Sequence, residues 1–166
     1  MSDIREGELA LPLDPAAERP DAGLVFIGRI ASPWKSREEC PKNMNAARER
    51  GLWAKAHVDA VYRPGLDGLT GTTHVVLLTW LDRAGRNLIV QKPRHAQEPR
   101  GVFSLRSPVR PNPIGLHVAR LIALDAASGV LTLDAIDVLD GTPIIDIKPY
   151  YASTDAIPEA STGKAS

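Results

Sequence analysis

The chain is a succession of short runs rich in β-branched and aromatic residues, separated by turn sequences, and it lacks long amphipathic helical repeats. The runs that we expect to be strands are residues 24–30, 57–62, 72–81, 86–91, 116–124, 129–136 and 144–147. Because no long helices alternate with these strands, the pattern argues against a doubly wound nucleotide-binding fold. It predicts a mostly β protein, a single-domain antiparallel β-barrel, closed or nearly closed, with short helical turns.

The turn sequences indicate how these strands pair. Residues 72–81 are almost continuously apolar, as in a central strand, and we expect 86–91 to be their hairpin partner. A second hairpin is expected between 116–124 and 129–136. Residues 45–50 predict one or two helical turns, ended by the glycine that follows them.

Length and composition favour one globular domain with polar ends. The 166 residues, 43% of them apolar, suffice for one buried core. We expect a flexible N-terminal arm at 1–22, a β-barrel domain at 23–152 and a flexible C-terminal tail at 153–166.

The sequence gives no sign of a secreted or membrane-bound protein. The polar N-terminus does not resemble a secretory signal, and the apolar stretch Val75–Leu81 is too short to cross a bilayer. Cys40 is the only cysteine, which excludes an internal disulfide. We therefore expect a cytoplasmic protein without a membrane partner.

The net charge of zero hides a strong segregation of charge. Between residues 83 and 120, eight basic residues are opposed only by Glu98. The basic residues are Arg83, Arg86, Lys92, Arg94, Arg100, Arg106, Arg110 and Arg120. Such a patch can steer an anionic partner such as RNA. The alternative is that these arginines are simply solvated on several faces of the domain.

Common catalytic and metal motifs are missing. The chain has neither a G-x-x-x-x-G-K-S/T loop nor a G-x-G-x-x-G turn, and no G-x-S-x-G elbow precedes a nucleophile. The Asp-Pro-Pro-Tyr box of many amino-group methyltransferases is also missing. No metal is expected, because the cysteine has no partner and the histidines lack ligand spacing, at positions 57, 74, 95 and 117.

The first specific segment, residues 101–116, contains three closely spaced prolines. Each proline fixes its own φ and restricts the residue before it, so the loop presents its side chains with little loss of entropy on binding. Arg106 and Arg110 are suited to clamp a carboxylate or phosphate, and Asn112 to read an amide or a base edge. The alternative is a rigid connector whose arginines lie in water.

The second specific segment, residues 137–150, joins a turn to a charged strand. Its Asp-Gly-Thr-Pro sequence is a strong turn signal. Asp146 and Lys148 fall on one face of the strand that follows, and Tyr150 continues it. A carboxylate in that position is either paired or used in chemistry. A surface ion pair between Asp146 and Lys148 remains the alternative.

These two segments resemble the TsaA-like (VirR-like) family, whose best-understood members are TrmO-type tRNA adenine-N6 methyltransferases. The main matches are Arg106–Pro108 with Arg110–Leu116, and Leu139–Pro143 with Asp146–Tyr150. Weaker matches are Ile27–Pro33, His74 and Lys92–Arg94, so that the resemblance covers roughly residues 24–151. His117 stands where serine is common in the family, and Met44 where proline is common.

The resemblance implies a β-barrel homodimer that binds S-adenosylmethionine near the subunit interface and acts on tRNA. The implied cofactor contacts are Lys42, Asn43, Met44, Asp82, Arg83, Arg106, Leu116, Asp137, Val138, Leu139, Asp140 and Gly141. The implied RNA contacts are Arg94, Arg110 and Lys148.

The reaction implied is methylation of the exocyclic N6 of an adenosine beside the anticodon, one that already carries a threonylcarbamoyl group. The amine is a weak nucleophile, so the site must align it with the methyl donor and accept an N–H hydrogen bond. We expect Asn112 or Asp146 to be that acceptor, supported by Tyr150. The alternatives are a non-enzymatic S-adenosylmethionine- or nucleotide-binding module and an RNA- or protein-binding adaptor.

Overall fold

The structure is a computed structural model that describes residues 4–93 and 96–162. Its strands are β1 (Leu9–Ala10), β2 (Gly28–Ala31), β3 (Ala54–Val58), β4 (His74–Trp80), β5 (Leu88–Gln91), β6 (Arg100–Gly101), β7 (Ile114–Asp125), β8 (Val130–Leu133) and β9 (Pro143–Pro149). Its helices are α1 (Met44–Glu49), α2 (Ala152–Asp155) and two 3-10 helices, η1 (Ala60–Leu66) and η2 (Val102–Ser104). The predicted mostly β class with short helical turns is confirmed.

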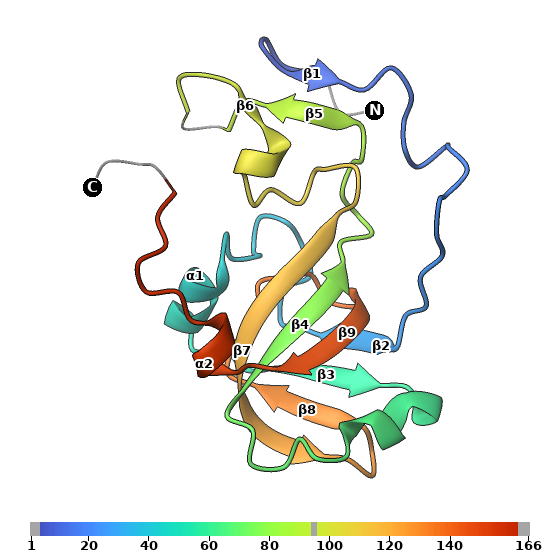
Figure 1. Ribbon diagram of the computed structural model, residues 1–166, viewed down its shortest axis with the longest axis vertical. Coiled ribbons are helices and arrows are strands. Elements are labelled where there is room, and N and C mark those ends of the chain that lie inside the picture. Colours follow the sequence, from blue (N-terminus) through green and yellow to red (C-terminus); the bar gives the residue numbers. More distant parts are fainter. Residues whose placement is uncertain (1–3, 94–95, 163–166) are drawn as a thin grey trace.

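Six strands close into an antiparallel barrel in the order β2-β3-β8-β7-β4-β9 (Figure 1). Buried residues alternate with exposed ones along β3 and with partly buried ones along β4, because successive side chains of a strand point to opposite faces. The inward side chains form the core, in which Ile30, Leu77, Leu131 and Ile144 are at most 1% exposed. The barrel predicted from the sequence is confirmed, as is the hairpin of β7 with β8.

A second, smaller sheet lies outside the barrel, in the order β1-β5-β6 (Figure 1). β5 and β6 belong to the stretch between β4 and β7, which leaves the barrel and returns to it, and β1 comes from the N-terminal segment. The predicted hairpin of 86–91 with 72–81 is therefore wrong: β5 pairs with β1 and β6 instead. The reason is that β7 and β9 already occupy both edges of β4, so no ladder position is free for β5.

Two predicted strands end or begin elsewhere than expected. The strand predicted at 57–62 stops at Val58, and η1 follows; Pro64 within it has no N–H for a ladder. The strand predicted at 24–30 begins only at Gly28, where pairing with β3 and β9 starts. A Cβ at Gly28 would lie 1.9 Å from the carbonyl oxygen of His57, so only glycine permits this close approach of β2 to β3.

Helix α1 follows the prediction closely. Asn43 is its N-cap, with its side-chain oxygen accepting the N–H of Ala46 at 2.9 Å. Gly51, at a φ of +64°, follows its last turn. Arg48 fastens the helix to β7 by donating to the carbonyl of Val118 at 2.6 Å, and it also pairs with Asp134 at 3.1 Å.

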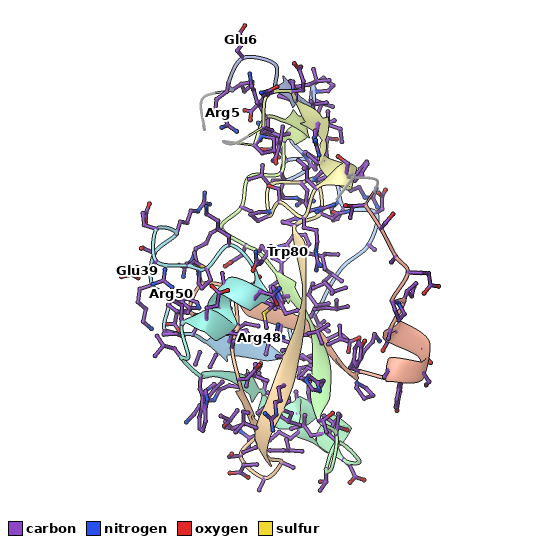
Figure 2. All side chains as sticks on the ribbon, turned by 90° about the vertical axis from the view of Figure 1, so that its left-hand side faces the viewer. Arg5, Glu6, Glu39, Arg48, Arg50 and Trp80 are labelled. Atoms are coloured by element: carbon purple, nitrogen blue, oxygen red, sulfur yellow. The ribbon has the colours of Figure 1, made fainter. Side chains whose placement is uncertain are left out.

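The ends of the chain make some ordered contacts. Within the segment 1–22, β1 pairs with β5, and Glu8 bonds Arg5 and the backbone N–H of Lys92. Within 153–166, the short α2 begins directly after β9. Figure 2 shows Arg5 and Glu6 at the end of the molecule far from α1, and Trp80 between these two regions.

Candidate active site

The loop Asp137–Gly141, which joins β8 to β9, is fixed by its own aspartate. Asp140 accepts the backbone N–H of Ser32 at 2.9 Å through Oδ1 and pairs with Lys35 Nζ at 2.7 Å through Oδ2. The hydrogen bond from Lys35, followed by that from Ser32, holds the pKa of Asp140 below its usual value. Both oxygens of this carboxylate therefore serve to hold the loop against the segment after β2.

Trp34 anchors the same loop from inside. Its side chain is 5% exposed, and its Nε1 donates to the carbonyl of Ile136 at 2.7 Å. Its own carbonyl accepts the N–H of Asp140 at 2.8 Å. The sequence reasoning missed Trp34 and Lys35, although the weaker family match ends at Pro33, directly before them.

Arg83, which the resemblance implied as a cofactor contact, approaches the loop from the segment after β4. Its guanidinium donates to the carbonyl of Asp140 at 3.2 Å, and its own carbonyl accepts a hydrogen bond from Arg37. Gly141 has a φ of +79°, and its N–H donates to the carbonyl of Ile30 at 2.8 Å. The loop is therefore held from both sides.

The proline-rich segment is held together largely by arginines that donate to backbone carbonyls. Arg106 reaches the carbonyl of Leu116 at 3.0 Å, and Arg110 reaches those of Leu105 and Ser107 at 3.1 and 3.3 Å. Arg86 reaches the carbonyl of Pro111 at 2.6 Å. These arginines thus brace the loop, while their charge still contributes to the local positive field.

Asn112 is exposed and lies beside the guanidinium of Arg86. Its Oδ1 accepts from Arg86 at 3.3 Å, and Arg86 also lies over the ring of Trp80 at 5.4 Å. Leu105 precedes Arg106, and its carbonyl is one of those that Arg110 binds.

The two specific segments meet on β7. Arg106 binds the carbonyl of Leu116, and the next residue, His117, bonds Asp137 at 2.6 Å, where the second segment begins. His117 also bonds Thr79 on β4 at 2.9 Å. These three hydrogen bonds therefore bring together the proline-rich loop, the barrel interior and the Asp137–Gly141 loop, which we call the aspartate-bearing loop.

Helix α1 lies against β7, to which Arg48 in its last turn is bonded. Lys42 and Asn43 are exposed, and Met44 packs against the hydrophobic core. Cys40 is near Asp137: burial, and then the negative charge of Asp137, raise the pKa of its thiol to about 11. The thiol is consequently protonated at neutral pH.

Asp146 lies two strands away from Leu116 on the outer face of the barrel. Leu78 of β4 pairs with both residues, with Leu116 on one side and Asp146 on the other. Residues paired in this way point to the same face, and two strand spacings amount to about 10 Å. The predicted catalytic carboxylate and the predicted cofactor contact thus share one row across the sheet.

The side chain of Asp146 is paired with Lys148 at 2.7 Å, the surface ion pair that the sequence left open. Its Oδ1 also accepts the N–H of Ile147 at 2.9 Å. The ring of Tyr150 meets that of His74 edge-on, with centroids 6.5 Å apart. Arg94, the remaining predicted RNA contact, lies outside the described residues.

A depression of about 370 Å³ between η1 and the end of β9 is lined by Tyr62, Asp67, Asp146 and Tyr151, among others. None of the predicted cofactor residues lines it. In residues 4–93 and 96–162, no group of three or more histidine, cysteine or acidic side chains is placed to hold a metal ion. In the same ranges, no helix combines the length and apolar character that a bilayer crossing requires.

Residues 29–156 match the family described as the tRNA-methyltransferase O N-terminal domain. A "Probable S-adenosyl-L-methionine-binding protein" of Methanothermobacter thermautotrophicus is 37% identical over 131 residues, covering 79% of this chain and 91% of that protein. The Escherichia coli "tRNA (adenine(37)-N6)-methyltransferase" is 33% identical over 147 residues, covering 84% of this chain and 62% of that protein.

Solved structures of TrmO are similar in fold to this chain. The crystal structure of TrmO from Pseudomonas aeruginosa superposes with a TM-score of 0.69 at 30% identity, covering 89% of this chain and 64% of that one. The chain also spans only 36% of a 37% identical relative from Archaeoglobus fulgidus, again a "Probable S-adenosyl-L-methionine-binding protein". Since the family match extends over most of the described barrel, the chain belongs to the family of the tRNA-methyltransferase O N-terminal domain.

Proposed function

We propose that this protein transfers a methyl group from S-adenosylmethionine to N6 of adenosine 37 in tRNA. The observation that carries the proposal is the convergence of the two specific segments on β7, through Arg106–Leu116 and His117–Asp137. We infer the substrate from the relatives that are named tRNA (adenine(37)-N6)-methyltransferase. We extend the proposal to an adenosine that already carries a threonylcarbamoyl group, which supplies a carboxylate for the arginines of the proline-rich loop.

The residues around Leu116 fit a zwitterionic, partly apolar cofactor. Arg106 keeps guanidinium donors for a carboxylate, and Asp137 offers a carboxylate oxygen to a hydroxyl or an ammonium group. Leu116, 49% exposed, and Met44 offer apolar surface. We assign the remaining cofactor contacts to the residues that the family resemblance implies: Lys42, Asn43, Asp82, Arg83, Val138, Leu139, Asp140 and Gly141.

For catalysis we propose Asp146 as the acceptor for the N–H of the target amine. The bound cofactor supplies an electrophilic methyl group. Asp146 lies in the same row of the sheet as Leu116, and its carboxylate oxygens, one of them 2.7 Å from Lys148 Nζ, are hydrogen-bond acceptors. Tyr150 offers a ring for stacking on the base, and Asn112 is the second candidate acceptor.

We propose that the active protein is a homodimer. The outer face of β4 and β7 presents apolar side chains, among them Ile114 at 45% and Leu116 at 49% exposure. A second subunit placed over this face excludes water from the row that contains Leu116 and Asp146. We assign the RNA contacts to Arg110, Lys148 and Arg94. We assign the activity to the β-barrel domain at residues 23–152, between the N-terminal arm and the C-terminal tail. A tRNA substrate places the protein in the cytoplasm.

A second candidate function, a binding module for S-adenosylmethionine without methyl transfer, is favoured by the names of several relatives. One experiment separates the two. The protein is incubated with methyl-labelled S-adenosylmethionine and tRNA whose adenosine 37 carries the threonylcarbamoyl group, and with the same tRNA carrying guanosine at position 37. We expect label only in the tRNA with adenosine 37. Cofactor binding without label in either tRNA contradicts the proposed enzyme and supports the module.

A further inference from the structure

His117 is a buried histidine to which the family resemblance assigns no role. Its side chain is 6% exposed and lies between two partners. Its Nδ1 is 2.6 Å from Asp137 Oδ1, and its Nε2 is 2.9 Å from Thr79 Oγ1. The imidazole thus joins the inside of the barrel to the first residue of the Asp137–Gly141 loop.

The chemistry of the partners sets the protons on this ring. An ionised carboxylate only accepts hydrogen bonds, so Nδ1 carries the hydrogen that binds Asp137. In the neutral ring, Nε2 then has a lone pair, and the buried Thr79 hydroxyl donates to it. The hydrogen bond to Asp137 therefore requires a hydrogen on Nδ1.

Gly115 provides the space for this chain of hydrogen bonds. A Cβ at this position would lie 2.4 Å from Thr79 Oγ1 and 2.5 Å from His117 Nε2. Any other residue here has to displace one of the two groups. The glycine, the threonine and the histidine consequently form one fitted unit in the barrel wall.

The unit has a consequence for Asp137. His117 occupies Oδ1, whereas Oδ2 has no hydrogen-bond partner within residues 4–93 and 96–162, and the side chain is 17% exposed. We propose that His117 is a positioning residue of the cofactor site, which clamps Asp137 so that Oδ2 is presented to a hydroxyl or ammonium group of S-adenosylmethionine. This inference rests on the proposed function and assigns a role within its site.

Two substitutions of similar size separate the clamp from simple packing. The amide of His117→Asn lies where Nδ1 lay and keeps a donor for Asp137, whereas the amide of His117→Gln lies where Nε2 lay and keeps only the contact to Thr79. By calorimetric titration of the whole protein with S-adenosylmethionine, we expect H117N to stay within about three-fold of the wild-type Kd and H117Q to weaken it about ten-fold or more. The exposed His57 gives matched controls, H57N and H57Q, with an unchanged Kd.

Thermal unfolding of each variant accompanies the titration. A merely structural histidine loses stability and affinity in parallel in both variants. Equal Kd values for H117N and H117Q therefore overturn the proposal, even where both proteins are destabilised. A weaker Kd confined to H117Q at a similar melting temperature supports it.

The tautomer gives a readout that needs no cofactor. In ¹⁵N spectra of the protein without ligand, we expect the His117 ring to carry a hydrogen on Nδ1; a ring whose only hydrogen is on Nε2 overturns the clamp. Failure of wild-type protein to bind S-adenosylmethionine, with the Nδ1 tautomer present, refutes the proposed function and with it the cofactor role of the clamp. Normal binding with the Nε2 tautomer refutes only the clamp.

Discussion

Replacing Trp34 by phenylalanine tests how the aspartate-bearing loop is anchored. The substitution removes the Nε1–H that donates to the carbonyl of Ile136 at 2.7 Å. Ile136 is only 1% exposed, so water cannot replace the lost donor. An unpaired buried carbonyl costs about 1–3 kcal/mol, and the smaller ring leaves a void that adds to it. We expect W34F to lower the free energy of unfolding by about 2–4 kcal/mol. Because the lost hydrogen bond holds Ile136, which directly precedes the Asp137–Gly141 loop, we expect cofactor binding to weaken as well.

The matched control is Trp53→Phe. Trp53 is 63% exposed, so its substitution changes stability by less than about 0.5 kcal/mol. Urea denaturation followed by circular dichroism at one protein concentration compares the two variants without relying on tryptophan fluorescence. If W34F and W53F have the same midpoint, the indole does not anchor the loop and the reasoning fails.

Three further predictions concern the same face of the barrel. Gly115→Ala should lower the free energy of unfolding by about 1–3 kcal/mol, because its Cβ overlaps the Thr79–His117 contact; urea denaturation checks this, and an unchanged midpoint is the contrary result. The pKa of Asp140 is lowered in the folded protein, so the stability that its carboxylate contributes is present above the unfolded pKa of about 3.9. This stability is lost as the pH falls through the lower pKa of the folded protein. The Asp140→Asn variant should therefore lose less stability on acidification than the wild type, which urea midpoints from about pH 5 to pH 2 measure. Asp146→Asn should lower kcat by about a hundred-fold with an unchanged Kd for S-adenosylmethionine in the methyl-transfer assay, and undiminished turnover removes Asp146 from the catalytic role.

The barrel was predictable because its signals are local. Short β-rich runs, turn residues and missing helical repeats determine the class, and the hairpin of β7 with β8 follows from Gly129, at a φ of +76°. The pairing of β5 with β1 and β6 was not predictable in the same way. Sequence neighbours favour a hairpin with β4, but both edges of β4 are taken by strands that come much later in the chain.

The site was predictable in its segments but not in all its contacts. Family motifs pointed to Arg106, Leu116 and Asp137, and the structure brings their loops together on β7. What the sequence does not reveal is that Arg110 satisfies carbonyls of its own loop, since backbone acceptors leave no pattern in side chains. His117 and its two partners, Thr79 and Asp137, lie on three separate elements, so only the fold brings them together.

The central claim is that the proline-rich loop and the aspartate-bearing loop bind one cofactor together. A crystal structure of the protein grown with S-adenosylmethionine tests it most directly. The account predicts polar groups of one cofactor molecule within hydrogen-bond distance of both Arg106 and Asp137, beside Leu116. A cofactor seated in the depression beside Tyr62 and Tyr151, away from both loops, contradicts it.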